Sequence, residues 1–156
     1  MKKFIILFAF IFLSNNISSA QYTNVLIANT NSPNEPSICI NPKNTNQIVA
    51  GSNLNLYYYS TNAGLNWTKA TLTSTYSVWG DPSLTVDTAG NFYYGHLTNA
   101  ASSYFIDRIV VQKSTNGGIN WSNGTFAGYI PPKQQDKEWL CVDPRNNNIY
   151  MSWTQF

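Results

Sequence analysis

The stretch Ser60-Thr61-Asn62-Ala63-Gly64-Leu65-Asn66-Trp67 returns almost unchanged as Ser114-Thr115-Asn116-Gly117-Gly118-Ile119-Asn120-Trp121. The copies differ only by Gly for Ala and by Ile for Leu, and each follows a strand-like segment, at 56–59 and at 109–113. A single copy of such a pattern is weak evidence, but two copies that each follow a strand predict two equivalent β-hairpins. Their separation is about one repeat of a propeller-like architecture, roughly 40 to 50 residues.

The residues of each copy have a joint physical logic. The Asn side-chain oxygen can accept hydrogen bonds from turn amides, and the second Gly position supplies the positive φ that the hairpin needs. The Ser hydroxyl can bond to nearby backbone groups, and the Trp is expected to begin the returning strand and to pack beneath the turn. Structural roles are therefore expected for Ser60, Asn62, Gly64, Trp67, Ser114, Asn116, Gly118 and Trp121.

A second repeat surrounds the first. The segments 35–42, 81–88 and 137–144 each begin with charged residues, continue as an apolar strand and end on Asn or Asp at a turn. Each is followed by another strand-like segment, at 47–52, 92–97 and 149–153. Turn residues rich in Pro, Gly and Asn join the pairs, as in hairpins. The expected fold is all-β, with two four-stranded antiparallel units and the first half of a third.

The Ser-Asn-Gly-Trp pattern resembles the Asp-box, S-x-D-x-G-x-x-W, of BNR-repeat proteins such as sialidases and related secreted bacterial proteins. The resemblance covers most of 35–156 and implies a partial β-propeller of about two and a half four-stranded blades. Both copies carry Asn where the family usually has Asp, which keeps the acceptor oxygen and loses the charge. In the family the Asp-box lies at the outer edge of a blade, so its residues are expected to be structural. Propellers close with about four to eight blades, so the remaining blades are expected from the rest of a longer chain.

The N-terminal 20 residues have the layout of a secretory signal peptide. Met1-Lys2-Lys3 is positive, 4–13 is apolar, and Ser18-Ser19-Ala20 resembles a cleavage site. The apolar run is too short for a membrane span, which needs about 20 residues. The alternative is a buried N-terminal helix. Export is the favoured interpretation, which leaves residues 21–156 as a secreted propeller segment.

Composition excludes several classes of partner. The net charge of +2 equals the contribution of Lys2 and Lys3, and the rest of the chain has no basic cluster. Nucleic-acid binding and attachment to an anionic membrane therefore have no electrostatic basis. Charged residues make up only 10% of the chain and aromatic residues 15%, a balance that suits short strands and turns better than helices.

Candidate functional residues cluster at the three strand starts. Glu35, Asp81 and Glu138, with Asp136, are weak catalytic candidates, because convergent carboxylates bind sugar hydroxyls or serve as acid and base. The alternative is that each satisfies backbone amides at a strand entry. Candidate binding residues are Trp79, Arg108 and Trp139. The two tryptophans could stack on sugar rings, but packing in the core is the favoured interpretation.

Other polar residues have less specific interpretations. His96 is the only histidine and has no evident partner, which favours a solvated or structural role. Asp107 and Arg108 form either a surface pair or part of a binding rim. Cys39 and Cys141 occupy matching repeat positions two units apart, which favours two separate buried thiols, with one disulfide as the alternative. No metal-ligand cluster is visible, and neither a metal nor a cofactor is expected.

The resemblance implies glycans as partners but does not establish catalysis. Sialidases grip the substrate carboxylate with three arginines, whose planar guanidinium groups bind it through two bonds, and they use a Tyr nucleophile. This chain has only Arg108 and Arg145. Three classes remain open: a sialidase-like glycoside hydrolase completed by further blades, a non-catalytic carbohydrate- or protein-binding propeller, and a surface adhesion module. The favoured function is a secreted sialidase-like protein that acts on or binds glycans, with catalysis unsupported within this chain.

Overall fold

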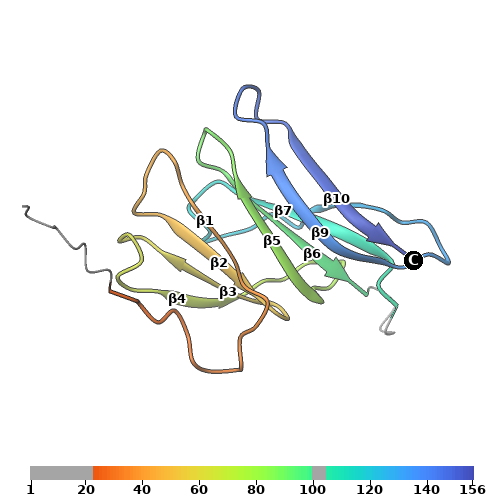
Figure 1. Ribbon diagram of the computed structural model, residues 1–156, viewed down its shortest axis with the longest axis horizontal. Coiled ribbons are helices and arrows are strands. Elements are labelled where there is room, and N and C mark those ends of the chain that lie inside the picture. Colours follow the sequence, from red (N-terminus) through yellow and green to blue (C-terminus); the bar gives the residue numbers. More distant parts are fainter. Residues whose placement is uncertain (1–22, 100–104) are drawn as a thin grey trace, which may run out of the picture.

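A computed structural model describes residues 23–99 and 105–156, which form antiparallel sheets and no helix (Figure 1). The predicted signal peptide at 1–20 lies outside these residues. The first sheet has the order β1 (Ser37–Ile40), β2 (Ile48–Ser52), β3 (Leu56–Ser60), β4 (Thr68–Thr71). The second has the order β5 (Gly80–Val86), β6 (Phe92–Thr98), β7 (Arg108–Ser114), β8 (Thr125–Ala127). The third pairs β9 (Gln135–Val142) with β10 (Ile149–Gln155).

This architecture confirms the predicted all-β fold with four-stranded antiparallel sheets. The repeat is visible in the strand register, because Ile40 pairs with Ile48 in the first sheet as Val86 pairs with Phe92 in the second. One detail of the prediction is wrong. Trp67 directly precedes β4, but β8 begins only at Thr125, so Trp121 does not begin a strand.

The first strands of the three sheets lie next to one another, β1 beside β5 and β5 beside β9 (Figure 1). One hydrogen bond recurs between them. The Leu84 amide donates to Ser37 Oγ at 3.0 Å, and the Leu140 amide donates to Ser83 Oγ at 2.8 Å. The donors and acceptors occupy matching repeat positions, so the second sheet is placed against the first much as the third is placed against the second.

The main hydrophobic core lies between the first two sheets. Its fully buried members include Val49 and Tyr57 from the first sheet and Phe92 and Tyr94 from the second. Trp121 packs against this cluster from the second turn. Burying each such side chain contributes roughly 1.5–3 kcal/mol to folding, so this junction supplies much of the stability of the described residues.

Both Ser-Asn-Gly-Trp turns have the expected local structure. We call Ser60 to Trp67 the first turn and Ser114 to Trp121 the second. In the first, Asn62 Oδ1 accepts a hydrogen bond from the Asn66 amide at 2.9 Å, and Ser60 Oγ accepts one from the Gly64 amide at 2.9 Å. Gly64 and Gly118 adopt φ of 82° and 85°, in the left-handed region that favours glycine.

Within residues 23–99 and 105–156, no helix is long and apolar enough to cross a membrane.

Candidate functional site

The three strand starts share an uncommon backbone conformation. Glu35, Asp81 and Lys137 occupy the same repeat position and have φ of 49°, 49° and 54°. A non-glycine residue in this region costs on the order of 1–3 kcal/mol and persists only where its surroundings impose it. Because this strained conformation recurs at the equivalent position of all three units, the strand starts are a candidate functional region.

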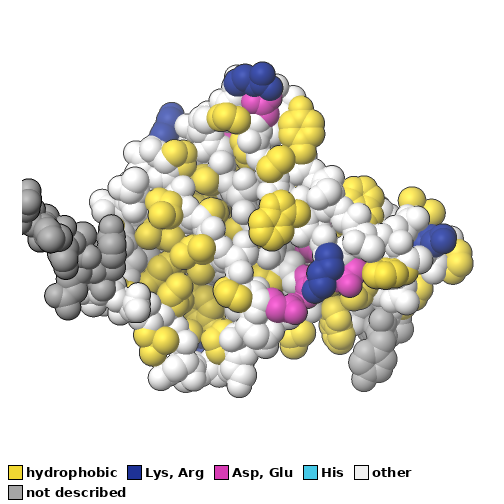
Figure 2. Space-filling view, in the orientation of Figure 1, with side chains coloured by type: hydrophobic (Ala, Val, Ile, Leu, Met, Phe, Trp, Pro, Cys, Tyr) yellow, Lys and Arg dark blue, Asp and Glu magenta, His cyan; other side chains and the backbone are white. Residues whose placement is uncertain are grey.

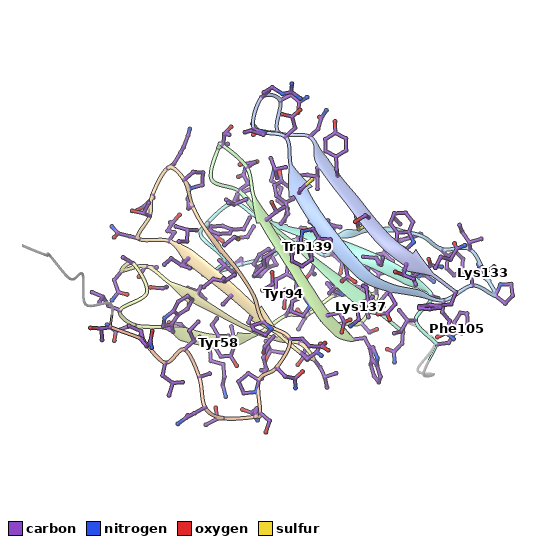
Figure 3. The ribbon with its side chains drawn as sticks, viewed as in Figure 1. Tyr58, Tyr94, Phe105, Lys133, Lys137 and Trp139 are labelled. Atoms are coloured by element: carbon purple, nitrogen blue, oxygen red, sulfur yellow. The ribbon has the colours of Figure 1, made fainter. Side chains whose placement is uncertain are left out.

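An ion-pair chain joins the three sheets at these residues. Lys137 Nζ lies 2.6 Å from Asp81 Oδ2 and 3.9 Å from Glu35 Oε1. Figure 2 shows a basic side chain between acidic ones at the position where Figure 3 labels Lys137. Burial alone would raise the pKa of Asp81, but the hydrogen bond from Lys137 helps to outweigh it and leaves that pKa lowered. The same hydrogen bond raises the pKa of Lys137. Asp81 is therefore ionised and Lys137 charged at neutral pH.

Asn53 ties two of the strand starts together. Its side-chain amide donates to Glu35 Oε2 and to Asn34 Oδ1, and its Oδ1 accepts a hydrogen bond from the Asp81 amide at 2.6 Å. Sequence reasoning missed both Asn53 and Lys137. The sequence could have identified Lys137, because this lysine occupies the repeat position that Glu35 and Asp81 occupy in the other two units. Asn53 lies outside every repeat that the sequence shows.

Glu138 is a buried carboxyl group at the third strand start. The residue is 4% exposed, and neither carboxyl oxygen has a hydrogen-bond partner among the described residues. Burial raises its pKa to about 8, so the group is mostly protonated at neutral pH. A protonated carboxyl is both a donor and an acceptor. The backbone amide of Glu138 itself has a smaller, opposing effect on this pKa.

These residues surround a pocket of about 250 Å³, which we call the strand-start pocket. Its lining consists of Glu35, Pro36, Asp81, Pro82, Lys137, Glu138 and Trp139. Trp139 is 69% exposed, and Figure 3 shows it on the viewed face with Lys137. Core packing, the favoured interpretation for this tryptophan, is therefore wrong. The structure thus brings together all three weak catalytic candidates and one of the binding candidates.

The other binding candidates lie elsewhere. Trp79 does not line the pocket, and its backbone amide donates to the Leu97 carbonyl at 2.9 Å. Arg108 forms a two-pronged ion pair with Asp107 at 2.9 and 2.7 Å, and its guanidinium carbon lies 4.1 Å from the centre of the Tyr129 ring. The predicted pair of Asp107 and Arg108 is therefore confirmed, but Asp107 is only 7% exposed, so the pair is largely buried. Arg145 pairs with Asp143 at 2.8 Å, away from the pocket.

His96 and the cysteines have structural surroundings. His96 is fully buried, its Nδ1 lies 2.9 Å from the Leu97 carbonyl oxygen, and burial lowers its pKa to about 4. Of the two predicted roles for His96, the structural one is therefore confirmed and the solvated one is wrong. Cys39 and Cys141 are not bridged, and Cys141 is exposed rather than buried as expected. Burial raises the pKa of the Cys39 thiol to about 12, which makes it unreactive.

The described residues hold no group of three or more His, Cys, Asp or Glu side chains able to bind a metal ion. The lining of the strand-start pocket includes the carboxyl groups of Glu35 and Asp81, the ammonium of Lys137, the indole ring of Trp139 and the buried carboxyl group of Glu138. Comparison with known proteins finds no matching family model, characterised protein or solved structure.

Proposed function

We propose that this chain is an exported segment of an Asp-box β-propeller that binds a neutral glycan in the strand-start pocket without itself catalysing a reaction. The repeated sheets and turns support the propeller organisation, and the layout of residues 1–20 supports export. In this arrangement the first strands of successive blades meet at the pocket. Further blades of a longer chain would complete its walls.

The observation that carries this proposal is that one pocket is lined both by Glu138, whose buried carboxyl oxygens have no partner among the described residues, and by the exposed Trp139. A buried polar group without a partner costs roughly 1–3 kcal/mol, and a ligand hydroxyl that bonds to it recovers that free energy. Sugars offer hydroxyls that donate and accept, together with an apolar ring face that stacks on an aromatic side chain. The lining of the strand-start pocket supplies a partner for each of these features.

The charges favour a neutral sugar over sialic acid. Glu35 and Asp81 face a single Lys137, whose ammonium is already bound to Asp81. No arginine lines the pocket, and Arg108 and Arg145 both bind neighbouring aspartates. An anionic sugar would meet excess negative charge and no free guanidinium group, which is the usual carboxylate ligand.

A glycan-binding screen followed by titration calorimetry tests the proposal. We expect a neutral oligosaccharide to bind, and Trp139→Ala to abolish binding. The matched control is Tyr150→Ala, which removes another exposed aromatic ring, 54% exposed on β10 and outside the pocket lining. Unchanged binding by Trp139→Ala, or preference for sialosides, would contradict the proposal.

The pH dependence of binding tests the role of Glu138. Because its pKa is raised to about 8, the carboxyl donates a hydrogen bond below that pH and loses its proton above it. We expect affinity for a neutral sugar to fall as pH rises through 8. Glu138→Gln, which keeps a donor and an acceptor at every pH, should remove this dependence. A pH dependence that survives in Glu138→Gln would rule out this role.

The opposed pKa shifts of Asp81 and Glu138 favour glycoside hydrolysis as a second candidate function. One carboxyl group is ionised and the other protonated at neutral pH, an arrangement that glycosidases use to separate base and acid. The test is release of a chromogenic aglycone from neutral glycosides. Turnover that Glu138→Gln abolishes would establish this function, and its absence in the wild type would leave binding alone.

A further inference from the structure

Two grooves separate the three sheets, and their walls match. In the first sheet, Val49 pairs with Tyr59 and Tyr57 pairs with Ala70. The second sheet has the same register at the matching positions, where Tyr93 pairs with Lys113 and Val111 pairs with Thr125. The two sheets therefore present equivalent faces to the units that follow them.

The first groove is filled by the second turn. Trp121 makes edge-on contacts with Tyr57 and Tyr94, at ring-centre distances of 5.9 and 5.5 Å. The Ile119 carbonyl accepts a hydrogen bond from the Tyr57 hydroxyl at 3.3 Å. Gly118 lies so close to the first sheet that a Cβ there would meet Val49 Cγ2 at 2.5 Å. A turn of the following unit thus covers the face of the preceding one.

The second groove is open. We call it the β8–β10 groove: a cavity of about 610 Å³ whose walls include Tyr93, Val111 and Thr125 on one side and Leu140, Ile149 and Met151 on the other. Tyr93, Val111 and Thr125 occupy the positions in the second sheet that Val49, Tyr57 and Ala70 occupy in the first. The second turn covers that part of the first sheet. The adjacent strand β10 pairs only with β9 among the described residues, so its other edge presents unpaired backbone groups that can accept a further strand.

We propose that the β8–β10 groove is the docking site for a β-hairpin that carries a third Asp-box turn. One strand of this hairpin pairs with the free edge of β10 and completes the third sheet. The turn tryptophan enters the groove against Val111 as Trp121 lies against Tyr57. The occupant follows from continuity with the first junction, where the equivalent wall receives the equivalent turn. The inference depends on the repeat organisation and not on sugar binding.

Titration of the isotope-labelled chain with a hairpin peptide tests the docking. The probe is a backbone-cyclised peptide of residues 108–127, because cyclisation holds together two strands that are marginally stable alone. We expect the amide signals of β10 and of Val111, Leu140 and Met151 to shift on addition of the peptide. A peptide carrying Trp121→Ala should bind at least about tenfold more weakly, since a buried aromatic anchor dominates such interfaces.

Two protein variants localise the effect. Thr125→Arg places a long charged side chain in the β8–β10 groove from an exposed position and should abolish the shifts. Thr71→Arg makes the same change at an exposed position on β4 and should leave them intact. Shifts confined to Val49 and Tyr57 would overturn the proposal, because the peptide would then be replacing the second turn. Concentration-dependent dimerisation that protects the groove without peptide would overturn it in favour of a second copy.

Discussion

The two Ser-Asn-Gly-Trp turns have nearly the same sequence and share the hydrogen bonds of their Ser and Asn side chains, but they have different surroundings. The Asn62 and Asn116 side chains each accept from an amide four residues later at 2.9 Å. A Cβ on Gly64 would first meet Ile48 at 3.5 Å, whereas one on Gly118 would overlap Val49. The eight-residue motif therefore determines the shape of the turn, while the unit packed against it determines how much the turn contributes to stability.

Removing the turn tryptophans should show the largest difference between the two copies. Trp121→Ala removes the ring that packs on Tyr57 and Tyr94, and we expect a loss of about 3 kcal/mol in the free energy of unfolding. Trp67 is partly buried, and its indole nitrogen donates to the carbonyl of Gly64 within its own turn. Trp67→Ala should therefore cost only about 1 kcal/mol, close to one hydrogen bond.

Urea unfolding followed by circular dichroism measures both tryptophan variants. Equal losses in the free energy of unfolding would contradict the proposed difference between the turns, because they would show that contact with the first sheet does not stabilise the second turn. A change in the slope of the transition would instead indicate that the sheets unfold separately.

The glycines at matching turn positions give the next largest difference. Both have positive φ, so Ala at either place carries a backbone cost of about 1 kcal/mol. Gly118→Ala adds the overlap with Val49, and overpacking of this kind typically costs a further 1–3 kcal/mol. We expect Gly118→Ala to lower the midpoint of thermal unfolding clearly more than Gly64→Ala. The double variant Gly118→Ala with Val49→Ala should recover part of the overlap cost, and the absence of recovery would argue against direct contact.

The same contrast explains how far the sequence predicts this molecule. The strands and turns followed from local patterns, because alternation of residue types and turn chemistry act over a few neighbouring residues. The docking of Trp121 on Tyr57 did not, since nothing in either local segment identifies the other. The late start of β8 has a similar origin: the buried Gln112 side chain donates to the Ser122 carbonyl at 2.8 Å, across the stretch where a strand was expected.

The candidate site was predicted in part for the same reason. Glu35 and Asp81 were found because the repeat places them at equivalent strand starts, and Glu138 because it flanks the third strand start. The ion pair of Lys137 with Asp81 and the bridging role of Asn53 depend on how separate sheets pack. Trp79 was selected because it precedes a predicted strand and Arg108 because it is next to Asp107, but neither residue lines the pocket.

The two turn serines should contribute equally to stability, because their hydrogen bonds lie within each turn and do not depend on the neighbouring sheet. Ser60 Oγ and Ser114 Oγ accept from the amides of Gly64 and Gly118 at 2.9 and 3.0 Å, and both serines are buried. Each Ser→Ala change should cost about 1–2 kcal/mol, because it leaves a turn amide without its acceptor. Denaturant midpoints for the two variants should agree closely. A much larger loss at Ser114 would mean that its hydroxyl also supports the contact with the first sheet.

A carboxylate in place of the amide at Asn62 or Asn116 should give the smallest effect and again an equal one. Asn62 and Asn116 keep the acceptor oxygen, which receives the serine hydroxyl at 2.9 and 3.0 Å as well as the later amide. A carboxylate strengthens such bonds, but both side chains are at least partly exposed. We therefore expect Asn62→Asp and Asn116→Asp each to stabilise the fold by about 0.5 kcal/mol at neutral pH. At a solvent-exposed position a charge-assisted hydrogen bond is more stabilising than a neutral one by roughly this amount.

This gain in stability should disappear when the pH falls below the pKa of an ordinary aspartate, about 3.9. Thermal unfolding at pH 7 and pH 3 measures it, and a gain in only one of the two turns would show that their hydrogen-bond networks are not equivalent in solution.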